Sequence, residues 1–95
     1  MVNKLQTARG LALSTLGEIF QDGAFSNIAL KKALGKATLS EVDKSLVTEI
    51  VYGTVSRKLT LEWYLSHFVA DRDQIDPWIY HLLLMSLYQF VYLEK

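Results

Sequence analysis

The chain has 95 residues, 51% of them apolar, and its formal net charge at pH 7 is zero. A chain of this length forms at most one domain and buries only about 60–65% of the surface that it exposes when unfolded. The apolar content excludes extended low-complexity disorder. The absence of cysteine excludes disulfides, thiolate nucleophiles and cysteine-based metal sites, and it fits a reducing cytoplasm, the localisation that we expect.

The charges are unevenly distributed. Residues 1–36 carry five basic and two acidic side chains, a net charge of +3, and residues 37–95 carry five basic and eight acidic ones, a net charge of −3. The amino-terminal part is therefore the better place for a phosphate backbone if RNA binds, although an ordinary solvated face explains the excess equally well.

The apolar spacing predicts a first helix from about Asn3 to Gln21, because one stripe recurs every three or four residues. Asn3 can serve as the N-cap, and Gly23 can end the helix because glycine accepts the left-handed backbone conformation. The stripe consists of Leu5, Ala8, Ala12, Leu16 and Ile19.

A second helix is expected from Ser26 to Leu34, with Gly35 ending it. Its solvent face carries Lys31 and Lys32. Its apolar face consists of Ile28, Ala29, Ala33 and Leu34.

Ser40 begins a third helix that runs to about Arg57, since Ser40 and Asp43 have capping-box spacing. A wide apolar arc makes this helix central to the fold. Asp43 and Arg57 intrude on that arc: their charged groups either reach water at the helix ends or find buried partners, and Arg57 could instead contact a phosphate. The arc consists of Val42, Leu46, Val47, Ile50, Val51, Gly53 and Val55.

A fourth helix is predicted from Thr60 to Val69, capped by Thr60, and a fifth begins at Asp76-Pro77 after a polar loop. The fourth should turn Leu61, Tyr64, Leu65 and Phe68 inward. The fifth is apolar almost all round, so other helices should surround it. No segment alternates with a period of two, and we therefore predict an all-α bundle of about five helices.

The most apolar segment, residues 78–93, is interrupted by polar side chains and is too short to cross about 30 Å of hydrocarbon, so we expect no membrane contact. No secretory signal is visible either, because polar side chains such as Lys4 interrupt the first twenty residues. The fifth helix has no later helix to cover it. We therefore expect the domain, residues 1–95, to lack its carboxy-terminal helices, and the exposed face could support a homodimer.

The sequence contains no recognisable catalytic constellation. His67 and His81 fall on different helices, and we interpret both as structural. The glycines match neither the dinucleotide-binding nor the P-loop pattern, and there is no parallel sheet on which a cofactor could bind in the usual way. We therefore expect no catalytic residue, cofactor or metal ion in this chain.

Six basic side chains are candidates for contact with RNA phosphates. The aromatic residues lie mainly on helical stripes, which favours core packing over base stacking. The candidates are Lys4, Arg9, Lys31, Lys32, Arg57 and Lys58.

Three segments, GAFSNIALKKAL (23–34), DKSLVTEIVYGTVSRKLTLEWYL (43–65) and DPWIYHLLLMSLYQFVYLEK (76–95), occur in a recognisable order and spacing. Together they resemble the NusB-like amino-terminal domain of the Sun/Fmu (RsmB) family of ribosomal RNA cytosine-C5 methyltransferases. The resemblance implies an all-α fold, association with ribosomal RNA, and a carboxy-terminal methyltransferase domain of the same protein. That domain, outside these 95 residues, would hold S-adenosylmethionine and the cysteine nucleophile.

The same resemblance implies roles for a few residues. Arg9 matches a basic position of the first helix, and Arg57 and Lys58 match the basic run after the glycine of the third helix. Ser56 departs from the pattern, because an arginine is common there.

The leading hypothesis is an RNA-binding, substrate-positioning module of a ribosomal RNA methyltransferase. One alternative is a NusB-type antitermination factor, which regulates transcription by binding RNA and protein. Another is a helical interaction domain that packs on its catalytic neighbour without touching RNA.

Overall fold

The computed structural model describes residues 7–36 and 38–93. Its helices in chain order are α1 (Ala8–Phe20), α2 (Ser26–Lys36), α3 (Glu41–Ser56), α4 (Lys58–Leu65) and α5 (Pro77–Tyr88). A 3₁₀ turn, η2 (Arg72–Gln74), precedes α5, which continues into a short π-helical segment, η3 (Gln89–Leu93). The described ranges contain no strand, and the predicted all-α bundle is confirmed.

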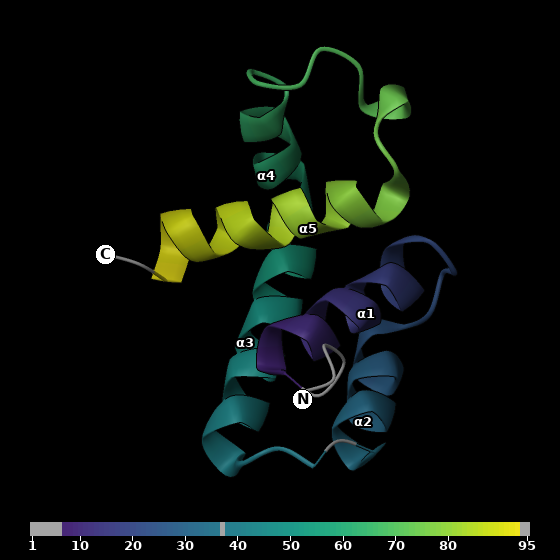
Figure 1. The fold of residues 1–95 in the computed structure, drawn as a ribbon, viewed down its shortest axis with the longest axis vertical. Helices are drawn as coiled ribbons and strands as arrows, with labels where there is room; N and C mark the ends of the chain where they lie inside the picture. Colours follow the sequence, from purple (N-terminus) through teal and green to yellow (C-terminus); the bar gives the residue numbers. More distant parts are fainter. Residues whose placement is uncertain (1–6, 37, 94–95) are drawn as a thin grey trace.

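The helices are arranged around a crossing of α5 over the junction between α3 and α4 (Figure 1). On one side of α5, α1 packs against both α3 and α5, and α2 packs against α1 and α3. On the other side, α4 packs against α5. The carboxy-terminal end of α5 and the point where α1 ends therefore lie on opposite sides of the molecule.

The core consists of two apolar clusters that α5 joins. The larger cluster lies between α1, α2, α3 and α5, and Leu16, Ile50 and Met85 are among its members. The smaller cluster lies between α4 and α5 and includes Leu61 and Leu84. Neighbouring residues of α5 thus face different clusters, which explains why this helix is apolar on most sides.

Several predicted helix ends are confirmed by their hydrogen bonds. Ser40 Oγ accepts a hydrogen bond from the backbone N–H of Asp43 at 3.2 Å, as the capping pattern predicts. Gly23, just after α1, has a φ of +76°, a conformation that suits glycine. Pro77 is the first residue of α5, although Asp76 at the cap position makes no side-chain capping bond.

Other predicted boundaries are wrong. α1 begins at Ala8, where Thr7 Oγ1 caps the helix through the N–H of Gly10 at 2.9 Å. The predicted start at Asn3 and the stripe member Leu5 lie outside the described residues. Gly35 does not end α2, which continues to Lys36.

Thr60 does not cap α4, because that helix begins at Lys58 directly after the end of α3. The backbone N–H of Leu61 donates to the carbonyl oxygen of Arg57 at 2.9 Å, so Arg57 both ends one helix and begins the next. α4 ends at Leu65, and Phe68 lies in the turn that follows. Helical spacing therefore does not apply to Phe68, and its side chain is exposed instead of buried.

Three further apolar side chains are exposed where the sequence predicts burial. Ile28 lies outside the narrow face of α2 that meets α1 and α3, and Leu30 takes the buried place. Val42 lies in the first turn of α3, and Tyr64 lies beside the inward-facing Leu65. Periodicity predicted which residues share one face of a helix, but how much of that face the adjacent helices cover decides how many of these residues are buried.

α3 and α5 approach each other closely at Gly53. A Cβ atom at this position would overlap the ring of Tyr88, which is only 5% exposed. Among the described residues, none of the helices combines the length and apolar character needed to span a bilayer.

Candidate nucleic-acid interface

The basic candidates are separated by the fold into distinct regions. Arg9 lies at the start of α1, and Arg57 lies at the junction of α3 and α4. Lys31 and Lys32 lie on α2, whereas Lys4 lies outside the described residues.

Arg9 is held against the carboxy-terminal end of α5. Its Nε donates a hydrogen bond to Oε1 of Gln89 at 2.6 Å. The amide of Gln89 is fixed in turn, because its Nε2 donates to the carbonyl oxygen of Met85 at 3.3 Å. Gln89 is buried while Arg9 is exposed, so this contact fixes the arginine stem and leaves the side chain accessible to solvent.

Arg57 contacts the same end of α5 from the α3–α4 junction. Its guanidinium carbon lies 4.5 Å from the ring centroid of Tyr92, within the range of a cation–π interaction. Tyr92 stacks on Tyr88 at a centroid distance of 5.4 Å and an interplanar angle of 27°. The stack rests on the buried Tyr88 ring and so orders the exposed Arg57 side chain.

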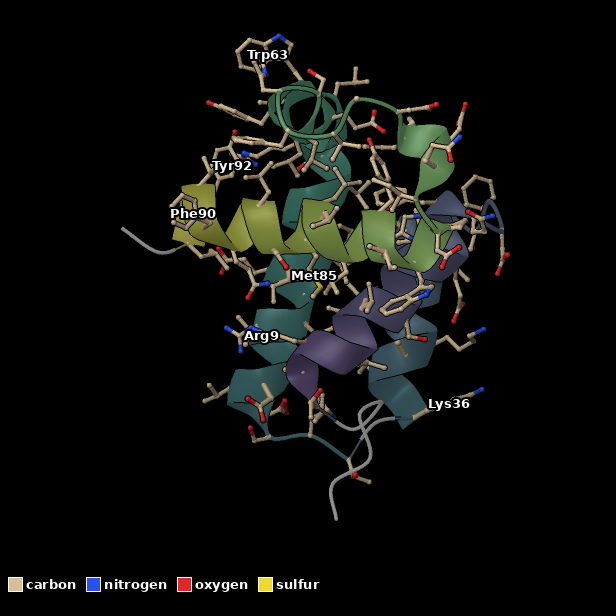
Figure 2. All side chains as sticks on the ribbon, turned by 45° about the horizontal axis from the view of Figure 1, so that its top comes forward. Arg9, Lys36, Trp63, Met85, Phe90 and Tyr92 are labelled. Carbon is tan, nitrogen blue, oxygen red and sulfur yellow. The ribbon has the colours of Figure 1, made fainter. Side chains whose placement is uncertain are left out.

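Phe90 lies in the same segment, and its side chain is 72% exposed. Figure 2 shows Arg9, Phe90 and Tyr92 on one side of the molecule, and Lys36, which ends α2, on the other. We define the α5-end surface as Arg9, Arg57, Gln89, Phe90 and Tyr92.

The α5-end surface carries two arginine side chains, and the ion pairs of the described residues lie elsewhere. Among residues 7–36 and 38–93 the ion pairs are Lys32–Glu18 and Arg72–Glu62, so neither arginine of this surface is engaged in one. Arginines beside exposed aromatic rings suit single-stranded nucleic acid, since guanidinium groups bind phosphates and every base can stack on a ring.

The other basic candidates have different surroundings. Lys32 is paired with Glu18 at 3.2 Å, and the carboxylate weakens the attraction of this lysine for a phosphate. Lys31 lines an open groove between α2 and α3 together with Tyr52. The Nζ of Lys58 lies 5.1 Å from the ring centroid of Phe20, whereas Arg57 lies over the ring of Tyr92. The structure therefore brings Arg9 and Arg57 to one end of α5 and does not place Lys31, Lys32 or Lys58 with them.

The aromatic members of the α5-end surface were missed in the sequence, where they were assigned to core packing. The run Gln89-Phe90-Val91-Tyr92 is too apolar to signal a surface, and only the crossing of α5 reveals that its end projects beyond α3.

The two histidines lie in separate environments. His81 is 7% exposed and its ring centroid lies 5.5 Å from that of Phe20. Burial, and to a lesser extent the charges of Lys58 and Arg72, lowers the pKa of His81 below its usual 6.5. His67 is exposed, with Nδ1 3.0 Å from the carbonyl oxygen of Trp63. The part of the chain that the structure describes contains no group of three acidic or histidine side chains arranged for a metal ion.

Comparison with known proteins gives consistent matches. The model of the NusB family matches residues 6–95. The probable ribosomal RNA small subunit methyltransferase B of Bacillus subtilis (strain 168) is 39% identical over 92 residues, which are 97% of this chain and 21% of that protein. The protein of the same description from Synechocystis sp. (strain ATCC 27184 / PCC 6803 / Kazusa) is 33% identical over 91 residues, or 94% of this chain and 20% of that protein. The chain thus spans about a fifth of these relatives, and no solved structure matches it.

Proposed function

Since the chain belongs to the NusB family, we propose that it is the RNA-binding, amino-terminal domain of a longer methyltransferase that modifies small-subunit ribosomal RNA at cytosine C5. In this proposal residues 1–95 position the RNA and catalyse nothing. S-adenosylmethionine and the reacting groups belong to a catalytic domain of the same cytoplasmic protein, outside these residues. The names of the two relatives support the ribosomal RNA substrate.

The α5-end surface is the observation that carries this proposal. It combines two arginines, outside the ion pairs of the described residues, with an exposed phenylalanine and a tyrosine that already stacks on a guanidinium group. Phosphates would bind Arg9 and Arg57, and an unpaired base would stack on Phe90. Such contacts hold a single strand with little preference for its sequence, so base selection belongs to the catalytic domain.

The expected salt dependence follows from the number of phosphate contacts. Each neutralised phosphate on a single strand contributes a slope of roughly −0.7 to the dependence of log K on log salt concentration. Two arginines therefore account for a slope of about −1.4.

The test uses fluorescence anisotropy of a labelled single-stranded RNA from the small ribosomal subunit, titrated with the 95-residue chain at several salt concentrations. The double variant Arg9→Gln, Arg57→Gln should lose at least tenfold in affinity and about 1.4 units of slope. The matched control Lys31→Gln, Lys36→Gln removes the same charge from α2 and should change neither quantity appreciably. Loss of RNA binding in the control variant alone would indicate that RNA binds α2 and would refute the α5-end surface as the binding site.

The same variants distinguish the alternative functions. In the longer protein, the arginine variant should raise KM for RNA and leave KM for S-adenosylmethionine unchanged. A NusB-type antitermination factor would bind RNA through this surface but would have no attached catalytic activity. An interaction domain that packs on a neighbour would bind no RNA at any salt concentration. A homodimer through α5, where Phe90 is exposed, stays a prediction, and light scattering of the chain tests it.

A further inference from the structure

Gln89 is a buried polar side chain at the end of α5. It is the first residue of the π-helical segment η3, and it is only 8% exposed. Its backbone N–H donates to the carbonyl oxygens of Met85 and Ser86, in the last turn of α5. Its side-chain Nε2 also donates to the carbonyl oxygen of Met85, at 3.3 Å. The backbone and the side chain of Gln89 are thus anchored to the same turn, which fixes the amide in one orientation.

The fixed amide presents its oxygen to Arg9. Oε1 of Gln89 accepts a hydrogen bond from Nε of Arg9 at 2.6 Å, although the two residues lie 80 positions apart in the sequence. This bond satisfies the buried amide oxygen, as a buried polar group requires. Among residues 7–36 and 38–93, Nη1 and Nη2 of Arg9 make no hydrogen bond, so both terminal nitrogens stay available to a ligand.

The available nitrogens suit a phosphate. The terminal nitrogens of a guanidinium group form a planar fork that matches two phosphate oxygens. A long side chain loses rotamer freedom when it binds, and a contact that already holds the side chain lowers this cost. Arg9 also borders a hollow of about 510 Å³ whose walls include Ser86 and Phe90, so space for a nucleotide adjoins the held guanidinium group.

The neutrality of Gln89 matters as much as its place. A glutamate has nearly the same shape, but its carboxylate would form an ion pair with Arg9 and compete with a phosphate. An apolar side chain would fill the same space and leave Arg9 without an anchor. The uncharged amide orients the guanidinium group and preserves its charge for the nucleic acid.

We propose that Gln89 is a positioning residue of the α5-end surface, whose buried neutral amide holds Nε of Arg9 and reserves the two terminal nitrogens for an RNA phosphate. The inference rests on the proposed RNA-binding function and deepens it. Gln89 acts through Arg9, and the strength of RNA binding depends on the amide as well as on the arginine.

The test uses the same anisotropy titration of the 95-residue chain with labelled single-stranded RNA. Gln89→Met keeps the length of the side chain and removes both of its hydrogen bonds. It should weaken RNA binding about threefold, the cost of immobilising one long side chain. The salt slope should stay unchanged, because both arginines are still present. Gln89→Glu should weaken binding further and reduce the slope by about 0.7, since the carboxylate would replace one phosphate on Arg9.

Two controls separate positioning from a structural role. Gln74→Glu adds the same charge on η2 and should change neither the affinity nor the slope. In an Arg9→Gln background, Gln89→Met should have no further effect on RNA affinity, because the residue that it positions is gone. Circular dichroism at 222 nm reports the folding of each variant, and the Gln89→Met cycle decides the question even where Gln89→Glu does not fold.

Three results would overturn the proposal. If Gln89→Met bound RNA as tightly as the unchanged chain while Arg9→Gln bound it more weakly, Arg9 would need no positioning. An equal loss from Gln89→Met with and without Arg9 would show that Gln89 supports only the fold. If Arg9→Gln left RNA binding unchanged, Arg9 would not belong to the RNA-binding site at all, and the proposed site would fail together with this inference.

Discussion

The close approach of α3 and α5 makes Gly53→Ala the most informative stability test. In the interior of a helix, alanine is ordinarily about 1 kcal/mol more favourable than glycine. Here the added Cβ would overlap two ring carbons of Tyr88, Cζ and Cε1, and its hydroxyl oxygen. Over-packing a core typically costs about 1–3 kcal/mol. Because Tyr88 is 5% exposed and supports Tyr92, we take the upper part of that range and expect a net loss of about 2 kcal/mol.

The assay is urea unfolding followed by circular dichroism at 222 nm. Gly17→Ala is the matched control, because Gly17 also lies within a helix and a Cβ there meets nothing within 4 Å. This control should gain about 1 kcal/mol. In a Tyr88→Ala background the obstacle is gone, so Gly53→Ala should become stabilising by a similar amount. If Gly53→Ala in the otherwise unchanged chain stabilised it as much as Gly17→Ala does, the predicted clash with Tyr88 would be refuted.

Three further predictions concern buried polar groups. Because His81 has a lowered pKa in the folded chain, the unfolded chain binds more protons, and the free energy of unfolding should fall as the pH decreases through 6.5. His81→Phe should make the free energy of unfolding less dependent on pH, as measured by urea titrations between pH 7.5 and 5.5. Burial, and then the hydrogen bond and charge of Glu62, raises the pKa of Tyr80, so Glu62→Gln should lower that pKa in an ultraviolet titration and cost about 1–2 kcal/mol of stability. Thr54 Oγ1 is buried without a hydrogen-bond partner among the described residues, so Thr54→Val should stabilise the chain by about 1 kcal/mol in the same unfolding assay; a loss would show that the hydroxyl is satisfied.

The fold was largely predictable from local chemistry. Caps and breakers such as Ser40, Gly23 and Pro77 act on their own turns, and the structure confirms them at those positions. Burial was less predictable, because it depends on how far a neighbouring helix extends. Phe68 shows this limit: its spacing matches the inward stripe of α4, but the helix ends three residues before it.

The candidate interface was predictable only in part. Arg9 and Arg57 were identifiable by charge, but 48 residues separate them in the sequence, and nothing local indicates that α5 joins them. The crossing of α5 also exposes Phe90, and the apolar residues around Phe90 gave no indication of this exposure in the sequence.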